Sequence, residues 1–135
     1  MFETRITVRG YEIDSYNHVN NAVYLSYMEH ARWEILNKTG IIDYVKRKNL
    51  LIVVTGTNIR YKGMAKLFDE LVITTKIERE DPYIIFRHGI FNVSTDRKIT
   101  TASVKTILID ENHIPVDIPD ELADIYFRST DDNKQ

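Results

Sequence analysis

In the amino-terminal part of the chain, the spacing of the hydrophobic residues changes once, from every second residue to the spacing of a helix. Apolar and polar residues alternate from Phe2 to Val8, which predicts a half-buried strand. Gly10 then gives the backbone freedom to turn. Between Asn21 and Thr39 the apolar residues recur at helical spacing, and Gly40 is a natural carboxyl-terminal stop. We therefore expect one long helix there, with an apolar stripe of Tyr24, Tyr27, Met28, Ala31, Ile35 and Leu36.

The rest of the sequence is dominated by strands. A short helical turn or two over Ile41 to Lys48 precedes four segments with strand character, which are Leu50 to Tyr61, Glu70 to Arg79, Tyr83 to Ser94 and Lys98 to Ile109. The last two are separated by a turn and predict a hairpin. A short closing helix is expected over Glu121 to Phe127, with Asp120 as its cap, before a polar tail from Ser129 to Gln135 that frays.

This order of elements predicts an α+β protein with a single domain over residues 1–128 and a polar tail over residues 129–135. One long helix followed by long strands fits an antiparallel sheet that covers one of its faces with that helix. The other face and the edge strands would then be left for a partner chain. We expect a homodimer or a homotetramer.

Composition narrows the classes of function. The 135 residues include 18 basic and 20 acidic side chains, so the surface as a whole has no field suited to nucleic acid or anionic lipid. The absence of cysteine excludes disulfides, thiolate nucleophiles and cysteine zinc sites, and the four histidines lack metal-ligand spacing. We expect no metal, no stable membrane insertion and, with no secretory leader pattern at the start, a cytoplasmic location.

The segment that joins the first strand to the long helix is rich in polar residues. Asn20 or Asn21 stands where a helix cap belongs, and the first helical turn offers unpaired N–H groups that stabilise a developing oxyanion. Asp14 lies on a loop that can return it to the same space, so the joint can supply a carboxylate as well. Taken alone, such residues are more often turn formers and caps, and the residues by themselves leave both interpretations open.

The run VRGYEIDSYNHVNNAVYLSYMEHAR resembles the signature of hotdog-fold acyl-CoA thioesterases of the 4-hydroxybenzoyl-CoA thioesterase superfamily, and it is most similar to the bacterial long-chain branch. The resemblance implies a hotdog fold, in which an antiparallel sheet wraps around one long central helix. It implies an acyl-CoA substrate, no cofactor, and CoA only as part of the substrate. Asp14 would act as nucleophile or as general base, and the backbone N–H near Asn21 would polarise the thioester carbonyl.

Several further residues are candidates with an alternative role. His18 can orient the thioester or a water, or it can fix the loop by a hydrogen bond. Asn20 is a cap first and a substrate contact second. Tyr24 can line an acyl tunnel or belong to the core. Arg60 and Lys62, with Lys66 nearby, can meet the phosphates of CoA or form an ordinary solvated loop.

Two matters stay open at this level. The loop from Lys62 to Asp69 departs from the family pattern, because Gly63 and Phe68 stand near places where other members have Pro and Gly. The same fold also serves enzymes that act on acyl carrier protein and proteins that bind acyl-CoA without cleaving it. Both remain alternatives to an acyl-CoA thioesterase.

Overall fold

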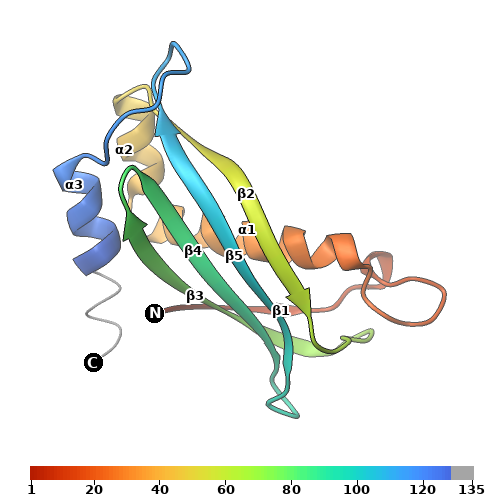
Figure 1. Ribbon diagram of the computed structural model, residues 1–135. Coiled ribbons are helices and arrows are strands. Elements are labelled where there is room, and N and C mark those ends of the chain that lie inside the picture. Colours follow the sequence, from red (N-terminus) through yellow and green to blue (C-terminus); the bar gives the residue numbers. More distant parts are fainter. Residues whose placement is uncertain (129–135) are drawn as a thin grey trace.

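A five-stranded antiparallel sheet and one long helix form the framework of the molecule (Figure 1). The computed structural model describes residues 1–128, so the predicted tail over residues 129–135 lies outside the described residues. The elements in chain order are β1 (Phe2–Thr7), a 3-10 turn (Gly10–Glu12), α1 (Asn21–Lys38), α2 (Ile41–Arg47), β2 (Leu51–Tyr61), β3 (Glu70–Glu80), β4 (Tyr83–Asn92), β5 (Lys98–Ile109), α3 (Asp120–Ala123) and a π-helical turn (Asp124–Arg128).

The predicted α+β class and the order of elements are confirmed, with small differences at the ends of elements. The strand predicted to reach Ser94 ends at Asn92, whose side chain accepts hydrogen bonds from the N–H groups of Ser94 and Thr95 and so begins the turn. Pro119, rather than Asp120, stands at the amino-terminal cap of α3, and Asp120 is the first helical residue.

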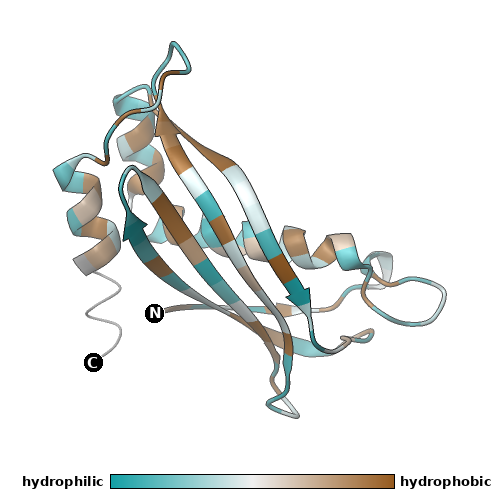
Figure 2. Ribbon diagram, viewed as in Figure 1, coloured by the Kyte–Doolittle hydropathy of each residue, from teal (hydrophilic) through white to brown (hydrophobic). Residues whose placement is uncertain are grey.

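The strands lie in the order β1-β3-β4-β5-β2, so β1 and β2 form the two edges. Hydrophobic and hydrophilic residues alternate along the inner strands (Figure 2). The register places Phe86 opposite both Ile77 and Val104, which puts these three apolar side chains on one face. In Figure 1, α1 crosses that sheet, and α2 and α3 lie together at one end of it.

The core consists of two clusters along α1. Near the start of the helix, Tyr24, Tyr27 and Met28 pack with the sheet residues Ile73 and Ile90. Towards its end, the second cluster joins α1, α2, α3 and the sheet through Ile35, Ile41, Leu122, Phe86 and Leu108. Each such buried side chain stabilises the fold by about 1.5–3 kcal/mol, so α1 is held along its whole length.

The edge strand β2 is long and largely exposed. Its outward hydrogen-bonding side has no partner strand among residues 1–128. Leu51, Val54 and Tyr61 remain 55%, 50% and 43% exposed. The pairing with β5 shifts register between Val54 and Gly56, so Thr55 forms a bulge near the middle of the strand. None of the helices in residues 1–128 is long and apolar enough to cross a membrane.

Candidate active site

The segment between β1 and α1, Val8 to Asn20, is called the joint loop here. An isolated bridge pairs Ile13 with Val19, and the Asp14 N–H donates to the carbonyl oxygen of His18 over 2.9 Å. Asn17 completes the reversal at a φ of +60°, in the left-handed region that asparagine tolerates better than most residues. The loop is therefore a tight, hydrogen-bonded turn that ends where α1 begins.

Asp14 uses one carboxylate oxygen to hold this turn. Its Oδ1 accepts from the N–H of Tyr16 at 2.9 Å and from the N–H of His18 at 3.3 Å. No group in residues 1–128 donates to its Oδ2, and the residue is exposed. One oxygen thus anchors the side chain while the other is available to a substrate or a water. The structural and the catalytic interpretations of Asp14 are compatible.

The start of α1 leaves one backbone N–H without an acceptor. Asn20 caps the helix as predicted, because its Oδ1 accepts from the N–H of Ala22 at 2.9 Å and its carbonyl oxygen accepts from the N–H of Val23 at 2.8 Å. Among the described residues, nothing accepts the N–H of Asn21. This group lies at the positive end of an 18-residue helix, which suits it to a negatively charged oxygen.

Glu12 is a buried residue that stabilises the joint loop. Nothing in the sequence indicated this role. The residue is 5% exposed, and its carboxylate accepts from the Arg9 N–H at 2.7 Å, from Arg9 Nη2 at 2.6 Å and from the Tyr27 hydroxyl at 2.8 Å. Burial raises the pKa of Glu12, but the hydrogen bonds from Arg9 and Tyr27 outweigh burial and hold its pKa below the ordinary value. Glu12 is therefore a buried anion that fixes the loop to α1.

A second segment, Lys62 to Asp69, braces the joint loop and is called the bracing loop. The N–H of Val19 donates to the carbonyl oxygen of Ala65, and the N–H of Leu67 donates to Asn17 Oδ1. Further along, the N–H of Val8 donates to the carbonyl oxygen of Asp69. The bracing loop therefore holds Asn17 and Val19, which flank the turn that carries Asp14.

Tyr24 belongs to the core, which is one of the two roles that the sequence left open for it. It is 1% exposed, and its hydroxyl accepts from the N–H of Ala65 in the bracing loop at 3.0 Å. Its ring lies 5.8 Å from that of Tyr61, whose hydroxyl donates to the carbonyl oxygen of Asn21 at 3.1 Å. Both tyrosines support the start of α1. The helical spacing had identified Tyr24 as apolar-facing, but nothing local indicated Tyr61.

The other predicted residues are distributed over two sides of the sheet. His18 is half-buried in the joint loop, and the hydrogen bonds of its backbone close the turn. Arg60 lies opposite Thr101, on the face turned away from α1, because its neighbour Tyr61 points towards the helix. Lys62 is exposed just beyond the end of β2. Arg60 is therefore separated from the joint loop by the sheet.

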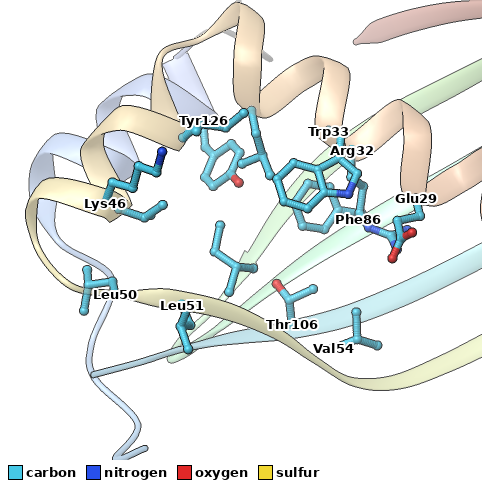
Figure 3. Close-up of a pocket in the computed structure, with 14 residues that line it drawn as sticks. Glu29, Arg32, Trp33, Lys46, Leu50, Leu51, Val54, Phe86, Thr106 and Tyr126 are labelled. Atoms are coloured by element: carbon cyan, nitrogen blue, oxygen red, sulfur yellow. The ribbon is translucent and has the colours of Figure 1, made fainter. Parts of the chain in front are cut away.

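A pocket of about 320 Å³ opens farther along α1, between that helix, α2 and β2 (Figure 3). Arg32 and Trp33 line it from α1 and Leu51 from β2, with apolar side chains making up most of its wall. Arg32 Nη1 lies 3.1 Å from Nε2 of the buried His88. Glu29, one turn before Arg32 on α1, forms no ion pair with it in residues 1–128.

Comparison with known proteins matches this chain to a thioesterase family and to individual thioesterases. The model of a family described as the thioesterase-like superfamily matches residues 8–125. The long-chain acyl-CoA thioesterase FadM of Escherichia coli is 42% identical over 77 residues, an alignment that covers 57% of this chain and 58% of FadM. The chloroplastic acyl-acyl carrier protein thioesterase ATL3 of Arabidopsis thaliana is 30% identical over 134 residues, covering 96% of this chain and 70% of ATL3.

A solved structure extends the similarity to three dimensions. The crystal structure of YbaW, a probable thioesterase from Escherichia coli, superposes with a TM-score of 0.85 at 31% sequence identity. The superposition covers 93% of this chain and 96% of that chain. The similarity therefore extends over nearly the whole of both chains.

Proposed function

The chain belongs to the thioesterase-like superfamily and has the hotdog fold, and on that premise we propose that it hydrolyses a fatty acyl-CoA to a free fatty acid and CoA. The observation that carries the proposal is that two groups near the joint loop have hydrogen-bonding capacity left for a substrate. Asp14 retains a free carboxylate oxygen, and the N–H of Asn21 at the start of α1 has no acceptor among the described residues. Thioester hydrolysis needs both a base or nucleophile and an oxyanion site.

Two routes use these groups. As a nucleophile, Asp14 Oδ2 attacks the thioester carbonyl carbon, the C–S bond breaks, and CoA leaves as a thiolate; water then hydrolyses the resulting anhydride. As a general base, Asp14 removes a proton from a water that attacks the same carbon. The C–S bond then breaks, and the sulfur takes the proton from Asp14 so that CoA leaves as a thiol. In both routes the carbonyl oxygen becomes negative and accepts from the N–H of Asn21.

The substitution Asp14→Asn tests the proposal. Asparagine keeps the oxygen that accepts from Tyr16 and His18, so the turn should survive, but the side chain is neutral and neither a base nor a nucleophile. We expect kcat for release of free thiol from acyl-CoA to fall by roughly 10²–10⁴-fold. Asp117→Asn, at an exposed aspartate away from the joint, is the matched control. An Asp14→Asn variant with wild-type kcat would refute the mechanism.

The similarity to ATL3 favours a second candidate carrier, acyl carrier protein. The chemistry at Asp14 would be the same, and only the group that delivers the acyl chain would differ. Hydrolysis of an acyl-carrier protein at a much higher kcat/KM than the matching acyl-CoA would support this alternative. Tight binding of acyl-CoA with full recovery of the intact thioester would instead indicate a protein that binds without cleaving.

The partners proposed from the sequence fit the surface of the molecule. The unpaired, partly apolar edge of β2 is suited to pairing with a second copy, which supports a homodimer or homotetramer. Lys62 is an exposed cation just beyond the end of β2 and remains a candidate for the CoA phosphates. Arg60 remains a candidate only for phosphates that extend to the other face of the sheet. Cytoplasmic location remains a prediction from the sequence.

A further inference from the structure

The pocket beside Arg32 combines an apolar wall with one charged group. Most of its lining comes from the second half of α1, from α2 and from the first residues of β2, and includes Trp33, Leu36, Val45 and Leu51. Phe86, Thr106 and Tyr126 complete it (Figure 3). Aliphatic and aromatic side chains of this kind suit a hydrocarbon chain. The guanidinium of Arg32 lies among them, which a purely hydrocarbon ligand does not require.

Arg32 has no anionic partner in residues 1–128. Its contacts are the Nε2 atom of His88 at 3.1 Å and the face of the Phe86 ring, 6.0 Å from the centroid. Burial lowers the pKa of Arg32 and the nearby Glu29 opposes that effect, yet Glu29 itself is exposed and forms no ion pair with it. The guanidinium therefore carries a partly desolvated positive charge, which is unfavourable unless an anion compensates it.

His88 cannot supply that compensation. Burial and the neighbouring Arg32 lower the pKa of His88 to about 3, so the imidazole is neutral near pH 7. Because arginine only donates hydrogen bonds, His88 Nε2 is the acceptor in this pair, and its Nδ1–H donates to Thr75 Oγ1 at 2.9 Å. The pair Thr75 and His88 thus orients the guanidinium and leaves its charge unneutralised.

We propose that this pocket binds a carboxylate at the end of an aliphatic chain, with the chain against Trp33 and Leu51 and the carboxylate oxygens accepting from Arg32. An ion pair of this kind in a partly buried site is a strong, charge-assisted interaction. The carboxylate has two possible sources: a free fatty acid, or the far end of a dicarboxylic acyl chain attached to CoA. The second source rests on the proposed hydrolysis.

The fluorescence of Trp33 gives a direct test, because it is the only tryptophan of the chain and it lines the pocket. The wild-type protein is titrated with decanoate and, separately, with decan-1-ol, which has the same chain length and no charge. We expect decanoate to bind at least about tenfold more tightly, equivalent to roughly 1.4 kcal/mol. Equal affinity for the two probes would overturn the proposal.

Variants of Arg32 make the test specific. Arg32→Gln should bring the affinities for decanoate and decan-1-ol to within about twofold, whereas Arg32→Lys should retain part of the preference because it keeps the charge. Arg97→Gln, at an exposed arginine of the β4-β5 turn, should behave as wild type. Retention of the full preference in a folded Arg32→Gln variant would also overturn the proposal.

Glu29 provides an independent variant that leaves Arg32 intact. It lines the mouth of the pocket and repels an incoming carboxylate. Glu29→Gln should therefore raise the affinity for decanoate several-fold without changing that for decan-1-ol. An unchanged or lower affinity for decanoate would contradict binding beside Arg32.

Kinetics distinguish the two sources. Hexadecanoyl-CoA and the CoA monothioester of hexadecanedioic acid are compared at equal concentration. If the dicarboxylic substrate has the higher kcat/KM and Arg32→Gln abolishes this preference, the carboxylate bound beside Arg32 is the far end of the substrate. If the two substrates have equal kcat/KM values and decanoate inhibits the wild type but not Arg32→Gln, the bound carboxylate is that of a free fatty acid. Absence of hydrolysis with both substrates would count against the proposed function, while the Trp33 titration would still decide the site.

Discussion

Tyr27 donates its hydroxyl hydrogen to Glu12 Oε1 over 2.8 Å and so ties the second turn of α1 to the turn that precedes the helix. Both groups are buried, and the acceptor is a carboxylate whose other partner is Arg9. A hydrogen bond to a charged group contributes more than one between neutral groups. The position of the joint loop relative to the helix therefore depends on this contact.

Removal of that hydroxyl should destabilise the protein measurably. We expect Tyr27→Phe to lower the free energy of unfolding by about 2 kcal/mol, because a buried carboxylate loses a donor and none replaces it. Urea denaturation followed by circular dichroism measures the change. Tyr16→Phe, at a tyrosine that is 78% exposed, is the control and should cost much less. Equal losses in the two variants would show that the contact is unimportant.

His88 should make the protein sensitive to mild acid. Its pKa is lowered in the folded state to about 3 from an ordinary 6.5, so protonation favours the unfolded chain. The contribution to stability is complete above pH 6.5 and is lost as the pH falls towards 3, with about 2 kcal/mol gone by pH 5. His88→Gln should flatten the dependence between pH 7 and 5, measured by urea denaturation at each pH. His30→Gln, at an exposed histidine, should retain the wild-type slope.

Phe68 holds a backbone conformation that suits glycine. Its φ is +68°, and its side chain is 74% exposed, so few contacts compensate the strained conformation. We expect Phe68→Gly to be more stable than Phe68→Ala by about 1 kcal/mol, since both remove the ring and only alanine retains a Cβ. Thermal unfolding of the two variants under the same conditions gives the difference. If alanine proved as stable as glycine, the bracing loop would not be strained at this residue.

The edge of β2 should control self-association. A lysine at Val53, on the exposed edge strand, is expected to convert an oligomer to a monomer, because a charge there opposes strand pairing between copies. Light scattering coupled to size-exclusion chromatography measures the mass. Thr7→Lys, on the opposite edge strand β1, should leave the mass unchanged. A wild-type monomer, or a Val53→Lys variant of wild-type mass, would refute association through β2.

Local sequence patterns were sufficient to predict the strands, the long helix and the cap of α1. The alternation in β1, the helical spacing in α1 and the amide of Asn20 all act within a few residues of one another, so their pattern is legible in the sequence. The candidate residues of the site could be grouped for the same reason, and the resemblance to the thioesterase signature gave them their expected roles. Asp14, Asn20 and Asn21 are close together in the chain.

The supporting residues depend on contacts between distant segments, which no local pattern contains. Glu12 meets a hydroxyl 15 residues away, Tyr61 meets a carbonyl 40 residues away, and His88 meets a guanidinium 56 residues away. The two roles of Tyr24, in the core or in an acyl tunnel, could not be distinguished from the sequence, because helical spacing identifies only an apolar face. Arg60 is an exception, because strand alternation in β2 is by itself enough to place Arg60 and Tyr61 on opposite faces of the sheet.

The bracing loop also sets the order in which the site can form. The hydrogen bonds within α1 join residues one turn apart, whereas those that fix the joint loop reach from Val8 to Asp69 and from Val19 to Ala65. Contacts between distant segments form only after the intervening chain has been closed into a loop. During synthesis, the joint loop therefore leaves the ribosome well before the segment that braces it. A fragment that ends at Lys48 would carry Asp14, Asn20 and Asn21 and would still lack the assembled site.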